Sequence, residues 1–477
     1  MHIQKHVLSI LLLSCMVIPM LALAQNDEPK VWTSSKQPLE EMQRIRNLIN
    51  APSFKNQDFL ITDYGAKPDG VYKNTEAFKK AIEACNKAGG GRVIVPAGKF
   101  LTGPIYLKSN VNLHLQDDAT IVFSRDTKDY PLVLTRWEGM DCMNYSPQIY
   151  AYEEMNIAVT GTGILDGNAD KNNWWPWKGR ADFGWKKGDP NQFMARDTLH
   201  LMMHNKVDPR KRIFGDGHYL RPYMLQPYNC KNILISGVKM ISSPMWFISP
   251  VMCENVTIEK VHVESHGPNT DGCDPDACKN VLIKDCYFDT GDDCIAIKSG
   301  RDEDGRGFGR PAENHIIEGC TMKDGHGGIV IGSEIAGGAR NIFAINCTMN
   351  SPELDRVLRV KTSSSRGGII ENVFLKDINV GQYKESAVHF NMFYEKAGDY
   401  IPTIRNIWVE NLDVEHGGDY AIWVNAYKES PVQFLRMVNC NIRGVKAPAK
   451  VDHLKNAVLE NVLINGALFT KSDLDKQ

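Results

Sequence analysis

Four short polar motifs contain residue types that could carry out acid–base chemistry on a charged substrate. They are Asn269-Thr-Asp271, Gly291-Asp-Asp293, Gly325-His-Gly327 and Arg359-Val-Lys361. Asp271 precedes Asp293 by 22 residues, and Asp293, His326 and Arg359 then follow at intervals of 33 residues. If the chain coils with about this period, three carboxylates, an imidazole and two cations meet on one face. Such a group has the composition of an active site.

Asp292 and Asp293 are adjacent and follow Gly291, which indicates a turn or bulge where both side chains reach solvent. Asp271 is one coil earlier and can lie beside them. Carboxylates this close repel one another, so at least one should keep its proton above the usual pKa near ~4. Hydrolysis of a glycosidic bond needs one protonated and one ionised carboxyl group. The alternative is an ordinary turn or a Ca²⁺ cage, but the neighbouring imidazole and cations favour catalysis.

The other motifs supply an imidazole and two cations. His326 lies between two glycines, and a hydrogen bond to one of the carboxylates would let it hold the charge pattern of the site. Arg359 and Lys361 are two residues apart on an expected strand, so both point to the same side. They could simply form ion pairs with the carboxylates. They also suit an anionic substrate, because arginine binds a carboxylate with two parallel hydrogen bonds, which points to an acidic sugar.

A repeat in the sequence predicts the elements that position these motifs. An Asn followed by apolar, β-rich residues recurs at Asn156, Asn232, Asn255, Asn280, Asn314, Asn341, Asn372 and Asn406, and more weakly at Asn456. From Asn232 to Asn406 the intervals are 23 to 34 residues. Short strands with turn residues between them exclude helical and leucine-rich repeats. The pattern predicts an all-β fold, a single-stranded parallel β-helix whose coils are stacked about 4.8 Å apart.

The cysteines fit the same coils. Cys230, Cys253 and Cys278 each precede a repeat's Asn by two residues, as expected for small buried side chains aligned from coil to coil. Spacing would allow a Cys273–Cys278 disulfide, but free buried thiols are the better interpretation. There is no pair of Cys-x-x-Cys motifs of the kind that binds zinc. The cysteines therefore give no reason to expect a zinc site.

Composition and the N-terminus bound the function classes. The chain has 477 residues, a net charge of −2 and 23% charged residues. This composition predicts no broad basic surface, so we expect no nucleic acid as a partner. Residues 1–24 read as a secretory signal peptide with cleavage after Ala24. A lipoprotein box ending at Cys15 is the less favoured alternative. No later segment predicts a membrane span, so we expect an exported protein that is otherwise soluble.

The remaining chain divides into a leader, residues 25–56, and a β-helix, residues 57–477. The leader predicts a short helix around residues 39–48, and a helix over residues 74–87 should cap the open end of the β-helix. Residues from about 167 to 222 interrupt the repeat and contain Trp174, Trp175, Trp177 and Trp185. These could stack on sugars or form the small core of the insertion, and the sequence favours neither.

In these four motifs, and from Ile61-Thr-Asp-Tyr-Gly-Ala to about the final coil, the chain resembles the family 28 glycoside hydrolases, the polygalacturonases. The resemblance implies a right-handed β-helix and hydrolysis with inversion, without a metal or cofactor. It implies Asp292 as general acid, Asp271 and Asp293 as the groups that activate water, and His326 as support for the acid. Arg359 and Lys361 would bind the galacturonate carboxylate. Asn269 and Lys298 are further substrate-binding candidates, with Lys298 the weaker one.

The text from Gly325 to Glu334 resembles the bacterial exo-acting branch of this family more than the fungal endo enzymes. The implied substrate is a pectic polysaccharide or oligogalacturonide, cut at α-1,4-galacturonosyl linkages, and the insertion would suit exo action by closing one end of the groove. Rhamnogalacturonan and xylogalacturonan hydrolases stay open, as do a β-helix pectin lyase and a non-catalytic sugar-binding β-helix. The sequence does not fix the oligomeric state, and a monomer is favoured.

Overall fold

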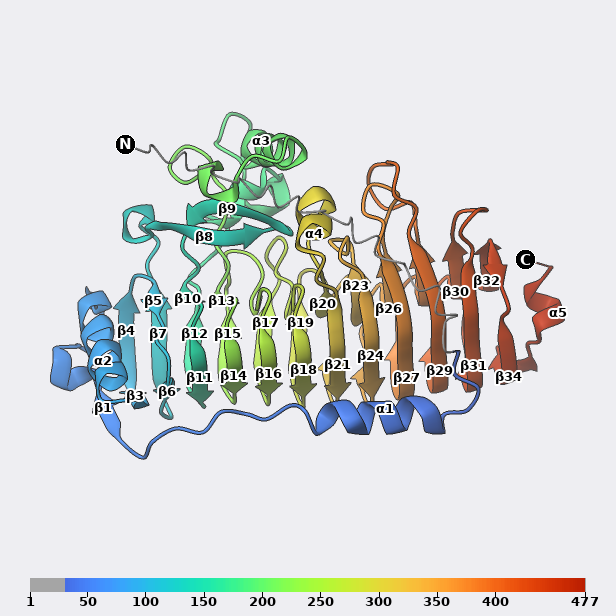
Figure 1. Ribbon diagram of the computed structural model, residues 1–477, viewed down its shortest axis with the longest axis horizontal. Helices are drawn as coiled ribbons and strands as arrows, with labels where there is room; N and C mark the ends of the chain where they lie inside the picture. The colour runs from blue at the N-terminus through green and yellow to red at the C-terminus, as the bar shows by residue number, and fades with distance from the viewer. Residues whose placement is uncertain (1–30, 477) are drawn as a thin grey trace, which may run out of the picture. The chain divides into compact units, whose positions relative to one another are not determined.

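The structure is a computed structural model that describes residues 31–476. The expected signal peptide and the alternative lipid site at Cys15 lie outside the described residues. From Trp32 onward the chain forms one compact unit, an elongated stack of parallel coils (Figure 1). Among the described residues, no helix is long and apolar enough to cross a membrane. The expected all-β parallel β-helix is confirmed.

Each coil contributes strands to three faces. The first face has in-register parallel pairs along its length. Its strands are β1 (Asp58–Leu60), β3 (Gly91–Val95), β6 (Val111–Leu115), β11 (Met155–Gly161), β14 (Lys231–Ser236), β16 (Glu254–Glu259), β18 (Lys279–Lys284), β21 (Ala312–Glu318), β24 (Ala339–Ile345), β27 (Ile369–Gln382), β29 (Thr403–His416), β31 (Val432–Ile442) and β34 (Val458–Ile464).

The second face consists of shorter strands that follow those of the first. They are β2 (Asp69–Lys73), β4 (Gly98–Thr102), β7 (Ala119–Phe123), β12 (Ile164–Asp166), β15 (Lys239–Ile241), β17 (His262–Ser265), β19 (Tyr287–Thr290), β22 (Thr321–Met322) and β25 (Thr348–Met349). From the next coil onward, long strands span both faces; the second half of β27 pairs with β25.

The third face carries the polar motifs. It begins with β5 (Ile105–Tyr106), β10 (Ile149–Tyr152) and β13 (Leu225–Tyr228), and continues through single bridges at Ile248 and Cys273. It ends with β20 (Ile295–Ile297), β23 (Ile329–Gly332), β26 (Arg356–Lys361), β28 (Ser386–Asn391), β30 (Tyr420–Asn425) and β32 (Ala447–Asp452).

The recurring asparagines form a ladder along one edge of the first face. Each donates its side-chain amide to the Asn of the preceding coil, over 2.5–3.3 Å, through Asn110, Asn156, Asn232, Asn255, Asn280, Asn314, Asn341, Asn372 and Asn406. All nine have positive φ, between 55° and 65°. Asparagine tolerates this left-handed backbone better than other residues with a side chain. The ladder therefore explains why Asn marks every repeat.

The interior of the coils is apolar and contains the aligned cysteines. Ile, Val, Leu and Phe side chains from all three faces form one continuous core. All 11 cysteines that the structure describes are buried free thiols, so Cys273 and Cys278 are not bridged. Alignment from coil to coil therefore explains the cysteine spacing without a disulfide or metal.

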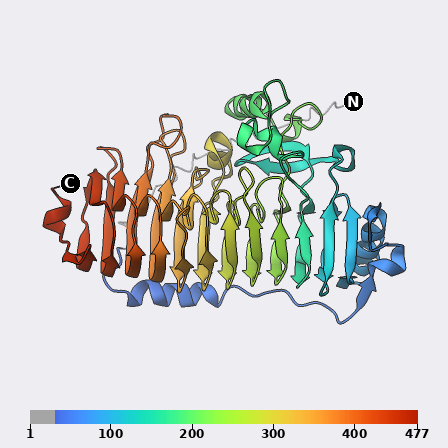
Figure 2. The ribbon, with the colours of Figure 1, turned by 180° about the vertical axis from the view of Figure 1, so that it is seen from behind.

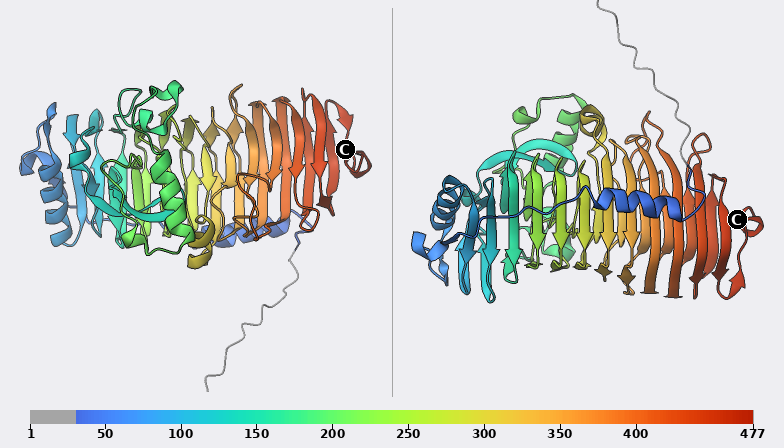
Figure 3. Two further views of the ribbon diagram at one scale, coloured as in Figure 1. Left: turned by 90° about the horizontal axis from the view of Figure 1, so that it is seen from above. Right: turned by 60° about the horizontal axis from the view of Figure 1, so that its bottom comes forward.

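Helices cover the ends and one side of the stack. Helix α2 (Thr75–Lys87) buries Phe78, Ala81 and Ile82 over the first coil, and α5 (Lys471–Leu474) lies at the other end, after the short strands β33 (Leu454–Lys455) and β35 (Ala467–Leu468). Helix α1 (Lys36–Arg46) lies along the outside of the first face, as Figures 2 and 3 show. Its Ile45 belongs to one buried apolar cluster with Phe343 and Trp408.

Two elaborations rise above the third face on its N-terminal side (Figure 3, left). One is the antiparallel hairpin β8 (Leu132–Trp137) and β9 (Met140–Tyr145), which the sequence analysis did not predict. The other lies between β12 and β13 and contains η3 (Trp175–Lys178), η4 (Ala181–Phe183), α3 (Phe193–His204) and η5 (Pro209–Lys211). Trp174 is fully buried against Tyr130 and Tyr145, so this tryptophan serves as core of the insertion.

Candidate active site

Strand register explains why the polar motifs meet. On the third face, Cys273 pairs with Ile295, and Ile295 pairs with Ile329. Asp271 and Asp293 each lie two residues before one of these paired positions, so their side chains stack on successive coils. One oxygen from each of Asp271, Asp292 and Asp293 lies within 4.8 Å of the other two. The structure therefore brings together the three carboxylates named from the sequence.

Asp293 lies at the bottom of the site. Its side chain is 0% exposed, and its two oxygens contact Lys361 Nζ at 2.6 Å and Arg359 Nη1 at 3.4 Å. The expectation that both Asp292 and Asp293 reach solvent is wrong for Asp293, because the register that stacks it on Asp271 turns it inward. Burial lowers the pKa of Lys361, but Asp293 outweighs this and raises it. Both cations of β26 are thus paired with a carboxylate.

Asp292 is the accessible carboxylate, with its side chain 17% exposed. Its Oδ1 contacts His326 Nδ1 at 2.9 Å and accepts the Asp293 backbone N–H at 3.0 Å, and its Oδ2 accepts the Asn269 amide at 3.2 Å. Burial opposes ionisation, yet the hydrogen bond and charge of His326 lower the pKa of Asp292. The same contact raises the pKa of His326, whose side chain is 53% exposed. The two groups share one proton.

Asp271 has the opposite electrostatics. Burial, then the charges of Asp274 and Asp292, raise its pKa well above the usual range, and its Oδ1 has no hydrogen-bond partner among the described residues. Asp274 is also buried, and burial raises its pKa to about 8 although Lys298 opposes this. The expected protonated carboxyl is therefore within this pair. Sequence analysis missed Asp274, three residues after Asp271, because only the coil geometry turns it toward Lys298.

Lys298 lies beneath the site and is buried. Its Nζ is 3.4 Å from Asp274, 3.9 Å from Asp271 and 3.2 Å from Glu334, and it lies over the Trp246 ring. Burial lowers its pKa, but these carboxylates raise it well above the usual value. The position is that of a buried counter-ion to Asp271, which departs from the substrate-binding role expected for Lys298. Glu334, its nearest carboxylate, ends the Gly325–Glu334 segment and had no role predicted from the sequence.

The insertion reaches the site through Asn269. The Oδ1 of Asn269 accepts hydrogen bonds from Lys178 Nζ at 2.6 Å and from Arg221 Nη2 at 2.9 Å, while its amide contacts Asp292. The Trp175 ring packs against Gly267, where a Cβ would meet it at 2.4 Å. Sequence analysis did not identify Lys178 or Arg221, because neither follows the period of the repeat. Asn269 thus joins the insertion to the accessible carboxylate.

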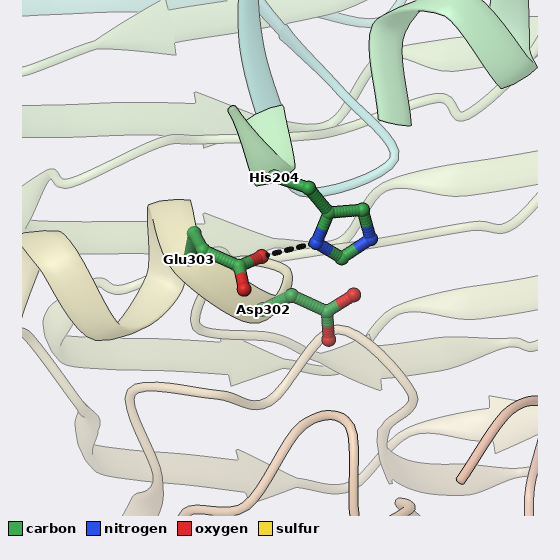
Figure 4. Close-up of side chains that lie close together, drawn as sticks. All are labelled: His204, Asp302 and Glu303. Atoms are coloured by element: carbon green, nitrogen blue, oxygen red, sulfur yellow. Dashed lines mark ion pairs between the residues drawn. The ribbon is translucent and has the colours of Figure 1, made fainter. Parts of the chain in front are cut away.

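Several groups of side chains have donor sets that could hold a cation. At the site, Asp271, Asp292 and Asp293 form one such set, but Lys298, Arg359 and Lys361 already supply positive charge to two of these carboxylates. A second set, His204, Asp302 and Glu303, joins α3 to α4 (Asp302–Phe308) (Figure 4). There His204 Nδ1 pairs with Glu303 at 2.7 Å, and Asp302 pairs with Arg366. These contacts anchor the insertion to the coils.

A cavity of about 420 Å³ opens beside His326 on the same face. Its lining includes His266, Asp324, Asp355, Lys384 and Glu385, and it is mostly polar. A polar, open site of this kind suits a hydrated substrate such as a sugar better than an apolar ligand.

Comparison with known proteins agrees with this geometry. The sequence profile of glycosyl hydrolases family 28 matches residues 215–461, and that of the rhamnogalacturonase A/epimerase, pectate lyase-like group matches residues 59–119. The chain is 29% identical over 347 residues to a probable polygalacturonase of Vitis vinifera, covering 70% of this chain and 63% of that protein. It therefore spans just under two thirds of that relative's length.

Two further relatives cover more of both chains. An exo-poly-alpha-D-galacturonosidase of Dickeya chrysanthemi is 26% identical over 455 residues, covering 84% of this chain and 74% of that protein. The crystal structure of a hyperthermoactive exopolygalacturonase from Thermotoga maritima superposes with a TM-score of 0.88 at 44% identity, covering 91% of this chain and 97% of that one. The family profile and this extensive similarity lead to one conclusion: the chain belongs to glycosyl hydrolases family 28.

Proposed function

We propose that the protein hydrolyses α-1,4-galacturonosyl linkages of pectin from the chain end, as an exo-polygalacturonase. The carrying observation is the cluster of Asp271, Asp292 and Asp293, which combines one accessible and two buried carboxylates within 4.8 Å. The printed names of the Dickeya and Thermotoga relatives support the exo assignment.

Asp292 is the general acid in this proposal, and His326 stores its proton. In the free protein the shared proton stabilises an ionised Asp292 beside His326. A bound galacturonate chain excludes water and brings its own negative charge, and both effects raise the pKa of a nearby carboxyl group. The proton then moves through Asp292 to the glycosidic oxygen as the bond between that oxygen and C1 breaks.

Asp271 and Asp293 hold the attacking water, and Asp293 is the base that deprotonates it. The water forms the new bond to C1, and its proton passes to Asp293 as Asp292 loses its own. Asp293 is suited to the base role because Arg359 and Lys361 stabilise its charge. Lys298 supports Asp271 from beneath. The carboxyl oxygens lie closer than the ~6.5–9.5 Å usual for inverting enzymes, so the expected inversion rests on the family and not on this spacing.

Exo action follows from where the insertion lies. It rises over the third face on the N-terminal side of the catalytic coils, while the C-terminal coils of that face carry no comparable cover (Figure 3, left). Trp175 and Lys178 come from this insertion and contact the loop that holds Asp271. A groove closed on one side accepts a chain terminus, which supports release of single units. The signal peptide predicted at residues 1–24 supports export, so that the protein is secreted or periplasmic.

The test is to digest polygalacturonate and short oligogalacturonides and identify the first products. We expect galacturonate monomer from the earliest times, a slow fall in viscosity and a product with inverted anomeric configuration by NMR. Mixed oligomers with a steep viscosity drop would contradict exo action. Unsaturated products, detected by their ultraviolet absorbance, would indicate a lyase. A higher rate on rhamnogalacturonan or xylogalacturonan than on polygalacturonate would reassign the substrate.

A further inference from the structure

The insertion and the coils beneath it place two cations beside the acid without a carboxylate partner. Lys178 donates to Asn269 Oδ1, and Arg221 donates to Asn269 Oδ1, Gln192 Oε1 and the carbonyl oxygens of Pro244 and Pro268. All of these acceptors are neutral. Among residues 31–476, no carboxylate oxygen pairs with either cation within 4.0 Å. The two positive charges are therefore balanced by nothing in direct contact.

The other cations of the site differ in this respect. Arg359 and Lys361 both pair with Asp293, and Lys298 pairs with Asp274 and Glu334. Binding a substrate carboxylate to those cations must compete with an existing ion pair. A carboxylate that approaches Lys178 meets an ammonium group whose only hydrogen bond in the structure goes to an amide oxygen.

Burial makes the positive charges of Lys178 and Arg221 costly. Arg221 is fully buried, and Lys178 is partly buried. The ammonium group of Lys178 and the guanidinium group of Arg221 donate to the same oxygen, Asn269 Oδ1. Burial, then the charge of Arg221, lowers the pKa of Lys178 to about 8. The charges of Glu138 and Asp292 offset part of this effect on the pKa of Lys178 from beyond ion-pair distance. A buried charge with no counter-ion in contact is unfavourable, and an anion that supplies this contact gains binding free energy. The pair is thus a built anion site with one accessible ligand, Lys178, and one fixed charge behind it, Arg221.

The position of this site identifies its occupant. Asn269 lies between the two cations and Asp292, so an anion on Lys178 lies on the insertion side of the acid. If the insertion closes the groove, as proposed above, the sugar on that side is the terminal unit released by hydrolysis. Its one anionic group is the carboxylate at C5.

We propose that Lys178 is the direct ligand of the carboxylate of the terminal galacturonate unit, with Arg221 supplying a second, buried positive charge. The inference rests on the proposed function and assigns the two sides of the cleaved bond to different cations. Lys178 selects the terminal acidic sugar. Arg359 and Lys361, bound to Asp293, serve the base and the sugar at the cleavage point.

The test compares Lys178→Met with the wild-type protein on digalacturonate. We expect kcat/KM to fall about 10–100-fold, the range for a hydrogen bond to a charged group, with Lys178→Arg recovering most of it. Lys186→Met, an exposed lysine of the same insertion, is the matched control and should behave as wild type. Thermal unfolding of all three variants reports whether each is folded.

Selective methyl esters locate the carboxylate. The Lys178→Met deficit should shrink to less than about threefold when the non-reducing-end carboxylate of digalacturonate is esterified, because that ester has no charge to lose. A full deficit with this ester, or no deficit on digalacturonate, overturns the proposal.

Calorimetry keeps the inference separate from the proposed function. Asp292→Asn protein should bind galacturonate, and adding Lys178→Met should weaken this binding about 10-fold or more. If the wild-type protein does not hydrolyse digalacturonate, the proposed function fails, while this binding comparison still decides the role of Lys178. Equal affinity of the single and double variants overturns it.

Discussion

The asparagine ladder and the catalytic face use polar side chains in the same coils in opposite ways. Along the ladder, one neutral residue type repeats, and each amide donates to its neighbour's oxygen within 3.3 Å. On the third face, charged residues of both signs stack instead, and the charges balance only in part. Asp271 Oδ1 has no hydrogen-bond partner among the described residues, and Lys178, which comes from the insertion, forms no ion pair with a carboxylate of residues 31–476. Regular pairing stabilises the coil, and irregular pairing leaves groups free for chemistry.

This contrast predicts that the two regions respond differently to substitution. Changes on the catalytic face should alter the rate more than the free energy of unfolding. Changes in the ladder should do the reverse. Five experiments test the contrast, from the largest expected effect to the smallest.

Asp292→Asn should lower kcat about 10²–10⁴-fold, the usual contribution of a general acid, because an amide cannot deliver the proton to the leaving oxygen. The side chain keeps its size, so substrate binding and thermal stability should change little. Steady-state kinetics on digalacturonate, with a melting curve as control, checks this. A variant with near wild-type kcat would remove Asp292 from the acid role.

Asn280→Ala should lower the free energy of unfolding by about 2–4 kcal/mol and leave kcat unchanged. It removes the hydrogen bonds to Asn255 and Asn314 and places a Cβ-bearing residue without a compensating side chain at φ 59°. Asn280→Gly removes the same bonds without the backbone strain, so its loss should be smaller by about 1–2 kcal/mol. Urea unfolding measures both. Equal losses for the two variants would mean that strain contributes nothing.

His326→Gln should move the alkaline limb of the kcat/KM profile to lower pH. In the wild type the shared proton is lost only at the raised pKa of His326. Without the imidazole the proton must stay on Asp292 alone, which releases it at lower pH. A profile that falls in rate without moving along the pH axis would argue that His326 does not store the proton.

The free energy of unfolding of His326→Gln should also differ from that of the wild type in a way that depends on pH. A raised folded-state pKa stabilises the protein fully below the unfolded value of about 6.5 and loses this contribution as pH rises through the folded pKa. Wild type should therefore exceed His326→Gln in stability more at pH 5.5 than at pH 8.5. The difference should be small, because His326 is more than half exposed and solvent screens the pair.

Chelation should have the smallest effect. Prolonged treatment with EDTA should leave the rate unchanged, because lysine and arginine side chains already neutralise the carboxylates. Loss of activity that Ca²⁺ restores would make Asp271, Asp292 and Asp293 a metal cage and favour elimination over hydrolysis. Activity assays before and after chelation, with added Ca²⁺ as control, separate the two.

The parts of the molecule that follow the repeat could be predicted from the sequence. The Asn pattern predicted the parallel coils, and the motif spacing predicted that Asp271 and Asp293 stack and that His326 lies beside them, because both depend on strand register. The register places His326 level with Asp292, one residue away from the predicted column. The parts outside the repeat could not. Lys178 reaches Asn269 across 91 residues, through an insertion with no period. The burial of Asp293 and Lys298 could not be predicted either. It depends on which way their side chains point near the turns, and sequence spacing alone does not determine this direction.

Helix α1 has a consequence for the order of folding. Its apolar side, with Met42 and Ile45, docks on a surface made by Ile316, Phe343, Phe374 and Trp408. These partners are synthesised some 270 to 370 residues later, which at the usual rate of translation is about 15–70 s. The leader must therefore wait for most of the coils before it can bind them. It is made first and docked late, so its attachment reports that coils far along the chain have formed.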